Sequence, residues 1–123
     1  MLNLGNITDV RIQSIKISAE IAHEHNVPFI IDAVGVACSQ LRRSLIKELL
    51  KDLKPTSIKG NFSEICALYD DFYSTLGVDT DETLNVEKIS NISVSIAQKY
   101  STMILASGEI DIVTDGESIV YIH

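Results

Sequence analysis

A short apolar stretch that ends in an acidic residue most constrains the fold of this chain. Phe29-Ile30-Ile31 is apolar without alternation, follows Pro28 and leads into Asp32. Such a stretch is typical of a strand in a parallel sheet that helices cover on both faces. Ligands of open parallel sheets bind just beyond the carboxyl ends of the strands, so Asp32 stands where chemistry is expected.

Helical patterns flank this strand. On its N-terminal side, Thr8 is a good cap for a helix that runs to about His25, and Asn26 can end that helix in a left-handed conformation. On its C-terminal side, Ser39 can cap a second helix that runs to about Leu53. The residues of this second helix that we expect to face the core, at i, i+4 steps, are Leu41, Leu45, Leu49 and Leu53.

The rest of the chain continues the alternation of strand and helix. We predict strands at 2–5, 56–59, 102–106, 110–113 and 118–122, helices at 62–69 and 86–100, and an exposed connection with a brief helical piece at 70–85. The Asp115-Gly116 pair favours a hairpin between the last two strands. The order predicts an α/β fold, with a mostly parallel sheet flanked by helices and a C-terminal antiparallel hairpin.

Coverage of this sheet is expected to be incomplete. No helix follows the final hairpin, so one face of the sheet lacks protection in this sequence. We therefore interpret residues 1–123 as a single, partial domain that belongs to a larger fold.

Composition excludes several classes of protein. The hydrophobic share of 46% and the charged share of 22% are typical of a soluble globular domain. A net charge of -7 without a basic stripe argues against a nucleic-acid partner. The longest apolar run, 27–38, contains Asp32 and is too short for a bilayer, and residues 1–5 show no basic segment of a secretory signal. Cys38 and Cys66 have no histidine at metal spacing, which predicts reduced, buried thiols in a cytoplasmic protein.

Asp32 is the first candidate site residue. A carboxylate at the end of a buried strand must find hydrogen bonds, a cation or a metal ion, and Gly35 would let a ligand approach the backbone closely. The alternative is a structural role, in which Asp32 caps the amides of its own turn.

A second group follows the next predicted strand. Lys59 can meet a phosphate, while Asn61 and Glu64, one helical turn apart, can hold the water shell of a magnesium ion. The alternative is a capping arrangement, in which Asn61 caps the helix and Glu64 returns a hydrogen bond.

Ser107-Gly108-Glu109 follows a third strand and suits contact with a nucleotide phosphate or ribose, although Ser-Gly is also ordinary turn chemistry. The histidines, at 23, 25 and 123, are dispersed and expected on the surface, so no histidine relay is indicated.

Taken together, these segments resemble hydroxyethylthiazole kinase, a family of the ribokinase-like superfamily. The resemblance rests on four blocks in order: 2–5, 31–39 with Arg42, 58–65, and 107–116. It implies an incomplete ribokinase-like fold and a kinase that transfers the ATP γ-phosphate to the hydroxyethyl alcohol of a thiazole, in thiamine biosynthesis or salvage. It also implies Mg²⁺ as cofactor, a cytoplasmic location, and a homotrimer for the intact enzyme.

The resemblance also implies residue roles. Lys59 stands where the family usually has an arginine on the ATP phosphates, Ser107 where a threonine contacts the nucleotide, and Asn61 belongs to the same ATP-binding motif. Asp32 and Glu64 match acidic positions near the metal and phosphates. Such a transfer needs positioning and charge neutralisation more than a covalent nucleophile.

Departures from the family pattern indicate a partial site. Ala33 replaces a usual proline, Ala37 a usual glycine, and the lysine at 59 lacks the bidentate guanidinium of an arginine. The family's substrate-binding segment and the glycine-rich segment with the catalytic base have no counterpart, so we assign no catalytic or substrate-binding residue and expect the chain to be inactive alone. The alternatives are a non-catalytic paralogue or interaction module that binds an intact kinase, and a ribokinase-like kinase for a pyrimidine alcohol or sugar.

Overall fold

The computed structural model describes residues 2–3, 9–36, 39–69 and 86–123, and in these ranges it confirms the predicted order of strands and helices. The strands are β1 (Leu2–Asn3), β2 (Ile30–Asp32), β3 (Ser57–Asn61), β4 (Met103–Ser107), β5 (Asp111–Thr114) and β6 (Ile119–Ile122). The helices are α1 (Asp9–Glu24), α2 (Gln40–Asp52), α3 (Phe62–Tyr69) and α5 (Val86–Tyr100). The cap predicted at Thr8 and the connection predicted at 70–85 lie outside the described residues.

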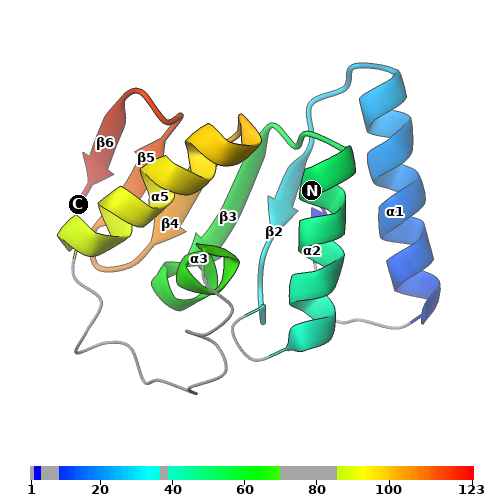
Figure 1. The fold of residues 1–123 in the computed structure, drawn as a ribbon, viewed down its shortest axis with the longest axis horizontal. Helices are drawn as coiled ribbons and strands as arrows, with labels where there is room; N and C mark the ends of the chain where they lie inside the picture. Colours follow the sequence, from blue (N-terminus) through cyan, green and yellow to red (C-terminus); the bar gives the residue numbers. More distant parts are fainter. Residues whose placement is uncertain (1, 4–8, 37–38, 70–85) are drawn as a thin grey trace.

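All six strands form one sheet, and their order in the sheet follows their order in the chain, β1-β2-β3-β4-β5-β6 (Figure 1). The pairs from β1 to β4 are parallel, whereas β4 with β5 and β5 with β6 are antiparallel. The predicted fold class is therefore confirmed: an α/β fold with a mostly parallel sheet and a C-terminal antiparallel hairpin.

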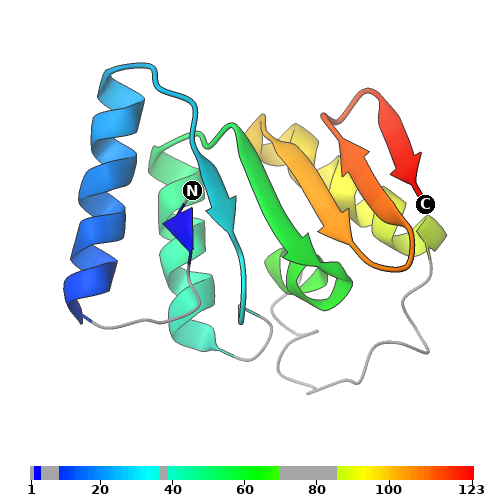
Figure 2. The ribbon, with the colours of Figure 1, turned by 180° about the vertical axis from the view of Figure 1, so that it is seen from behind.

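The four described helices lie on one face of this sheet. Figure 1 shows α2, α3 and α5 in front of the strands and α1 next to α2, beyond the β1 end of the sheet. In Figure 2, from behind, the strands lie in front of α2, α3 and α5. The expectation that helices cover both faces is wrong for the described part of the chain. The strand order explains this, because right-handed crossovers that step in one direction along a sheet all return over the same face.

The two faces of the sheet differ in burial. On the helix side, Ile31, Ile58 and Ile104 are fully buried neighbours on β2, β3 and β4. On the opposite side, large apolar residues are exposed: Ile30 by 42%, Met103 by 41%, Val120 by 55% and Ile122 by 50%. The pairing registers place these four on one face, which we call the open face. The prediction of an incompletely covered sheet is thus confirmed for the described residues.

The helix ends follow the predicted signals. Asn26 has a φ of 54°, the left-handed conformation expected just beyond α1. Ser39 caps α2, and its hydroxyl accepts a hydrogen bond from the amide of Arg42 at 3.2 Å. The prediction that Leu41 faces the core is wrong, since it is 56% exposed. A strict four-residue step drifts by about 40° around a helix, so the ends of such a row leave the buried face; in α2 the buried apolar residues are Leu45, Ile46, Leu49 and Leu50.

The hairpin between β5 and β6 forms around the predicted Asp-Gly pair. The Asp115 Oδ1 atom accepts hydrogen bonds from the amides of Ser118 at 2.8 Å and Glu117 at 2.9 Å, and Gly116 takes a φ of 96°. These bonds, from Ser118 first and then Glu117, lower the pKa of the Asp115 carboxyl below its usual value. An aspartate side chain therefore closes this turn.

The predicted burial of a cysteine and exposure of the histidines are confirmed where the structure describes these residues. Cys66 is a free thiol, 1% exposed, and burial raises its pKa to about 11. Cys38 lies outside the described residues, and the three histidines are exposed. No helix in the described ranges has the length and apolar character that crossing a membrane requires.

Candidate functional site

The carboxyl ends of β2, β3 and β4 meet at one edge of the sheet. Asp32 is the register partner of Lys59, and Asn61 is that of Ser107, which places the four on the open face. A depression of about 310 Å³ lies at this edge, and the residues that line it are Asp32, Val34, Lys59, Gly60, Asn61, Glu64 and Ser107. The structure therefore brings together all five residues that the sequence proposed for ATP and magnesium.

The turn that follows β2 is held by hydrogen bonds from four successive amides. The Asp32 carboxylate accepts one of them at its Oδ1 atom, so its predicted structural role is present. Its Oδ2 atom accepts no hydrogen bond from the described residues and stays available to a ligand. The four bonds join the Ala33 amide to the Lys59 carbonyl at 2.7 Å, the Val34 amide to Asp32 Oδ1 at 3.1 Å, the Gly35 amide to Glu64 Oε2 at 2.5 Å, and the Val36 amide to the Ala33 carbonyl at 3.2 Å.

Gly35 is the residue that lets this turn form. Its φ of 81° lies in the region that glycine adopts without strain, and it occupies the third position of the turn, as in type II geometry. The expectation that Gly35 lets a ligand approach the backbone is not supported. Its amide is bonded to Glu64, and the Arg42 side chain fills the space where a Cβ would project.

Asn61 and Glu64 form a capping box at the start of α3, as in the structural alternative. The Glu64 amide donates to Asn61 Oδ1 at 2.8 Å, and the Asn61 amide donates to Glu64 Oε1 at 2.9 Å. Both carboxylate oxygens of Glu64 are thus bonded to backbone amides, one in β3 and one in the turn after β2. The residue Glu64 is 8% exposed and is one of the residues that line the depression.

Lys59 and Ser107 supply the polar side chains on the two neighbouring strands. Lys59 is exposed at the depression, and among the described residues its ammonium forms no ion pair. Ser107 is half-buried beside it. The turn chemistry expected of Ser-Gly is also present, because the Gly108 amide donates to Asp111 Oδ1 at 3.1 Å.

Two contributors were missed by the sequence analysis. Val34 lines the depression because it follows Asp32 in the turn after β2. Arg43 is 8% exposed, and its Nη1 atom donates to the carbonyl of Val36 at 2.9 Å, which secures the far end of the turn. An arginine among the buried positions of α2 was the available signal, since a buried guanidinium needs acceptors.

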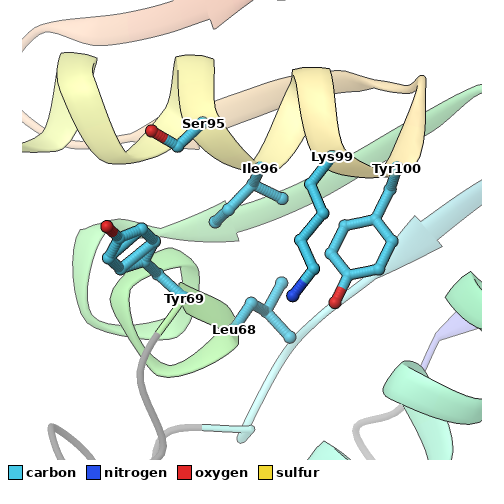
Figure 3. A pocket seen from close by; sticks show the side chains of 6 residues that line it. All are labelled: Leu68, Tyr69, Ser95, Ile96, Lys99 and Tyr100. Carbon is cyan, nitrogen blue, oxygen red and sulfur yellow. The ribbon is translucent and has the colours of Figure 1, made fainter.

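A second, smaller pocket lies between α3 and α5. Figure 3 shows Tyr69 and Tyr100 on opposite sides of it, with the Lys99 ammonium toward Tyr100, 5.2 Å from the centre of its ring. Its volume of about 90 Å³ is below the range of sites for drug-sized ligands. The volume of the depression at the strand ends, about 310 Å³, falls in that range. The residues that line the second pocket are Leu68, Tyr69, Ser95, Ile96, Lys99 and Tyr100.

The chemistry of the depression is that of an anion site with one available carboxylate oxygen. It offers the Lys59 ammonium, a hydroxyl, an amide side chain and Asp32 Oδ2. In the described ranges, no group of three or more histidine, cysteine, aspartate or glutamate residues could hold a metal ion by itself. A cation here would need ligands from water or from a bound phosphate.

Comparison with known proteins shows which family the chain belongs to. The model of the hydroxyethylthiazole kinase family matches residues 1–123. The chain belongs to this family.

Curated members of the hydroxyethylthiazole kinase family are similar over nearly the whole chain. A hydroxyethylthiazole kinase from Finegoldia magna is 46% identical over 117 residues, which are 95% of this chain and 43% of the relative. One from Brachyspira hyodysenteriae is 35% identical over 122 residues, which are 99% of this chain and 46% of the relative. The chain therefore spans less than half the length of these relatives.

The fold of the hydroxyethylthiazole kinase family is also seen in a solved structure. The hydroxyethylthiazole kinase protein from Pyrococcus horikoshii OT3 matches with a TM-score of 0.77 at 28% identity. The match covers 95% of this chain and 41% of the other. The described fold thus corresponds to part of that structure.

Proposed function

We propose that the depression at the carboxyl ends of β2, β3 and β4 binds the phosphates of ATP together with Mg²⁺. In this proposal the chain, as a single partial ribokinase-like domain, carries that part of a kinase site for the hydroxyethyl alcohol of a thiazole, in thiamine biosynthesis or salvage. The observation that supports it most is the convergence of residues from three strand ends in one depression. Membership of the hydroxyethylthiazole kinase family supports the choice of substrate.

The proposed nucleotide contacts come from Lys59, Asn61 and Ser107. The Lys59 ammonium would lie against the phosphates as a point charge, and the amide and hydroxyl side chains would orient the nucleotide by hydrogen bonds. Phosphoryl transfer proceeds mainly by positioning and charge neutralisation, so these residue types suit it.

The proposed metal side of the site consists of Asp32 and Glu64. Mg²⁺ usually keeps several waters and takes one or two carboxylates plus substrate phosphates, which fits a site with one available carboxylate oxygen. Asp32 Oδ2 would hold the ion directly or through water. When bound, the ion would neutralise charge that develops on the transferred phosphoryl group.

We propose that the 123-residue chain does not complete the transfer alone. The residues that line the depression include no histidine or cysteine, and this proposal assigns the one available carboxylate oxygen, Asp32 Oδ2, to the ion. No lining side chain is then left to act as a base on a substrate alcohol. The intact enzyme, in this proposal, is a cytoplasmic homotrimer. Purified chain with ATP, Mg²⁺ and the thiazole alcohol should give no product; turnover of roughly 1 per second, ordinary for kinases, would overturn this statement.

Nucleotide binding tests the proposed site directly. The chain should bind ATP in isothermal titration calorimetry, and Lys59→Met should weaken this binding by at least about tenfold, since a hydrogen bond to a charged group is worth ~1.5 kcal/mol or more. Lys54→Met is the matched control, because Lys54 is exposed before the amino end of β3. Equal affinities of Lys59→Met and the unchanged chain would refute the proposal.

A second candidate function is favoured by the open face. Its exposed apolar residues, Ile30, Met103, Val120 and Ile122, make a surface suited to a protein partner. The chain would then be a non-catalytic module that binds an intact kinase of the same family. Co-elution of the chain with a full-length hydroxyethylthiazole kinase in size-exclusion chromatography would support this function, and separate elution at micromolar concentrations would exclude it.

A further inference from the structure

The Glu64 carboxylate joins two segments that are remote in sequence. Its Oε2 atom accepts the amide of Gly35, 29 positions earlier in the chain, at 2.5 Å. Its Oε1 atom accepts the amide of Asn61 at 2.9 Å. The residue is 8% exposed and both bonds are partly buried, and charge-assisted bonds of this kind are strong.

One of these segments is the turn that follows Asp32, at the end of β2. The other three amides of the turn are satisfied by acceptors next to it in the fold, and Gly35 is the one that depends on Glu64. Without that acceptor, the Gly35 amide would be left unsatisfied beside a side chain that already fills the space over its Cα. The backbone of Asp32 is held by the pairing of β2 with β1 and β3, but its carboxylate accepts the Val34 amide of this turn, so the orientation of the Asp32 side chain is linked to Glu64 through the turn.

The other segment is the start of α3, which carries Asn61. The reciprocal bonds of the capping box fix the Asn61 side chain on the Glu64 amide and the Asn61 amide on the Glu64 carboxylate. The same carboxylate therefore joins the turn that follows Asp32 to the start of α3, where Asn61 lies.

We propose that Glu64 is a positioning residue, which holds the turn after β2 against the start of α3, and that it is not a direct ligand of the cation. The proposal rests on the proposed function, in which Asp32 and Asn61 contact the metal and the nucleotide. Direct ligation would compete with two backbone amides for the same oxygens, whereas Asp32 has one oxygen without a hydrogen bond from the described residues.

Amide hydrogen exchange tests the contact without any ligand. In the unchanged chain, the amides of Gly35 and Asn61 should be protected. In Glu64→Gln, one carboxylate oxygen becomes an NH₂ group that cannot accept, so protection of at least one of them should fall by about tenfold or more. The sheet amide of Ile58 should keep its protection. Glu87→Gln is the matched control, because Glu87 is also a first-turn helix glutamate but is exposed.

The outcomes of this experiment are decisive even if Glu64→Gln does not fold. Unprotected Gly35 and Asn61 amides in the unchanged chain would overturn the proposal. Equal protection of these amides in Glu64→Gln and the unchanged chain would overturn it as well.

The metal dependence of ATP binding separates positioning from ligation. If Glu64 is a positioning residue, Glu64→Gln should weaken ATP binding by a similar factor with Mg²⁺ and with EDTA. Mutation of residues that orient a binding group typically lowers affinity by about 10- to 100-fold. Asp32→Asn should lose affinity mainly with Mg²⁺. If Glu64→Gln loses affinity only with Mg²⁺, Glu64 is a ligand and the inference is wrong.

The same titrations distinguish failure of the inference from failure of the proposed function. An unchanged chain that binds no ATP under either condition would remove the proposed function, and with it any positioning role in nucleotide binding. The exchange experiment would then still decide whether Glu64 holds the two segments together.

Discussion

Two adjacent isoleucines on β2 test the one-sided arrangement of the sheet. Ile31 is fully buried against the helices, and Ile30 points to the open face with 42% of its surface exposed. Both are isoleucines in one strand, so their replacement by alanine changes β-propensity similarly, and the difference between the two variants reports mainly on burial.

The expected magnitudes follow from burial. Alanine at 31 removes three side-chain carbons, worth about 2.4 kcal/mol at ~0.8 kcal/mol per buried CH₂. A residual cavity of roughly 60 Å³ at ~24 cal/mol per Å³ raises the total to about 4 kcal/mol. Alanine at 30 loses only the buried part of the transfer free energy and leaves no enclosed cavity, which gives about 1.4 kcal/mol.

Urea unfolding of the two variants measures this difference. The free energy of unfolding of Ile31→Ala should be lower than that of Ile30→Ala by about 2.5 kcal/mol. If Ile31→Ala does not fold, Ile31→Val and Ile30→Val give the same comparison with a smaller expected gap, about 1 kcal/mol at most. Equal costs at the two positions would refute the reasoning, because they would mean that both faces of β2 are equally buried in solution.

Three further predictions concern single residues. Gly35→Ala should lower the free energy of unfolding by about 1–3 kcal/mol in urea melts, because alanine is strained at positive φ and its Cβ would collide with the Arg42 side chain; an unchanged melt would contradict the turn geometry. In a Cys38→Ser variant, Cys66 should react with Ellman's reagent at pH 8 only after unfolding, because burial raises its pKa to about 11; rapid reaction of the folded variant would contradict its burial. Asp115→Asn should destabilise the chain at pH 7 and less so at pH 2: the folded pKa of Asp115 is depressed, so its stabilisation is present above the unfolded pKa and is lost as pH falls through the folded pKa. A destabilisation that does not change with pH would argue against that pKa shift.

Local signals were sufficient to predict most of the elements. The apolar run before Asp32, the caps at Asn26 and Ser39 and the Asp-Gly pair each act within a few residues, so each is visible in the sequence. The incomplete coverage of the sheet was predicted, but the placement of all the helices on one face was not. Which face a helix covers depends on the order of the strands in space. That order is a property of the whole chain, and no short pattern encodes it.

The sequence predicted which residues lie at the site better than it predicted the hydrogen bonds between them. These four residues, Asp32, Lys59, Asn61 and Ser107, lie at or near the carboxyl ends of strands. Strand ends meet at one edge of a parallel sheet, so their proximity could be inferred. The bond from Gly35 to Glu64 could not, since it joins residues 29 positions apart with no periodic relation between them. The sequence left open whether Glu64 caps a helix or contacts a ligand. The structure shows that Glu64 caps α3, and that its carboxylate also accepts a hydrogen bond from the turn after β2.

The strand order also bears on how the chain acquires its structure. Every strand of the described sheet pairs only with strands that precede or follow it directly in sequence. During synthesis, each strand that leaves the ribosome therefore finds its neighbour already made, and none has to wait for a remote segment. Assembly can advance from β1 to β6 one strand at a time, which keeps loop-closure entropy low and shortens the time for which unpaired edges are accessible to other chains.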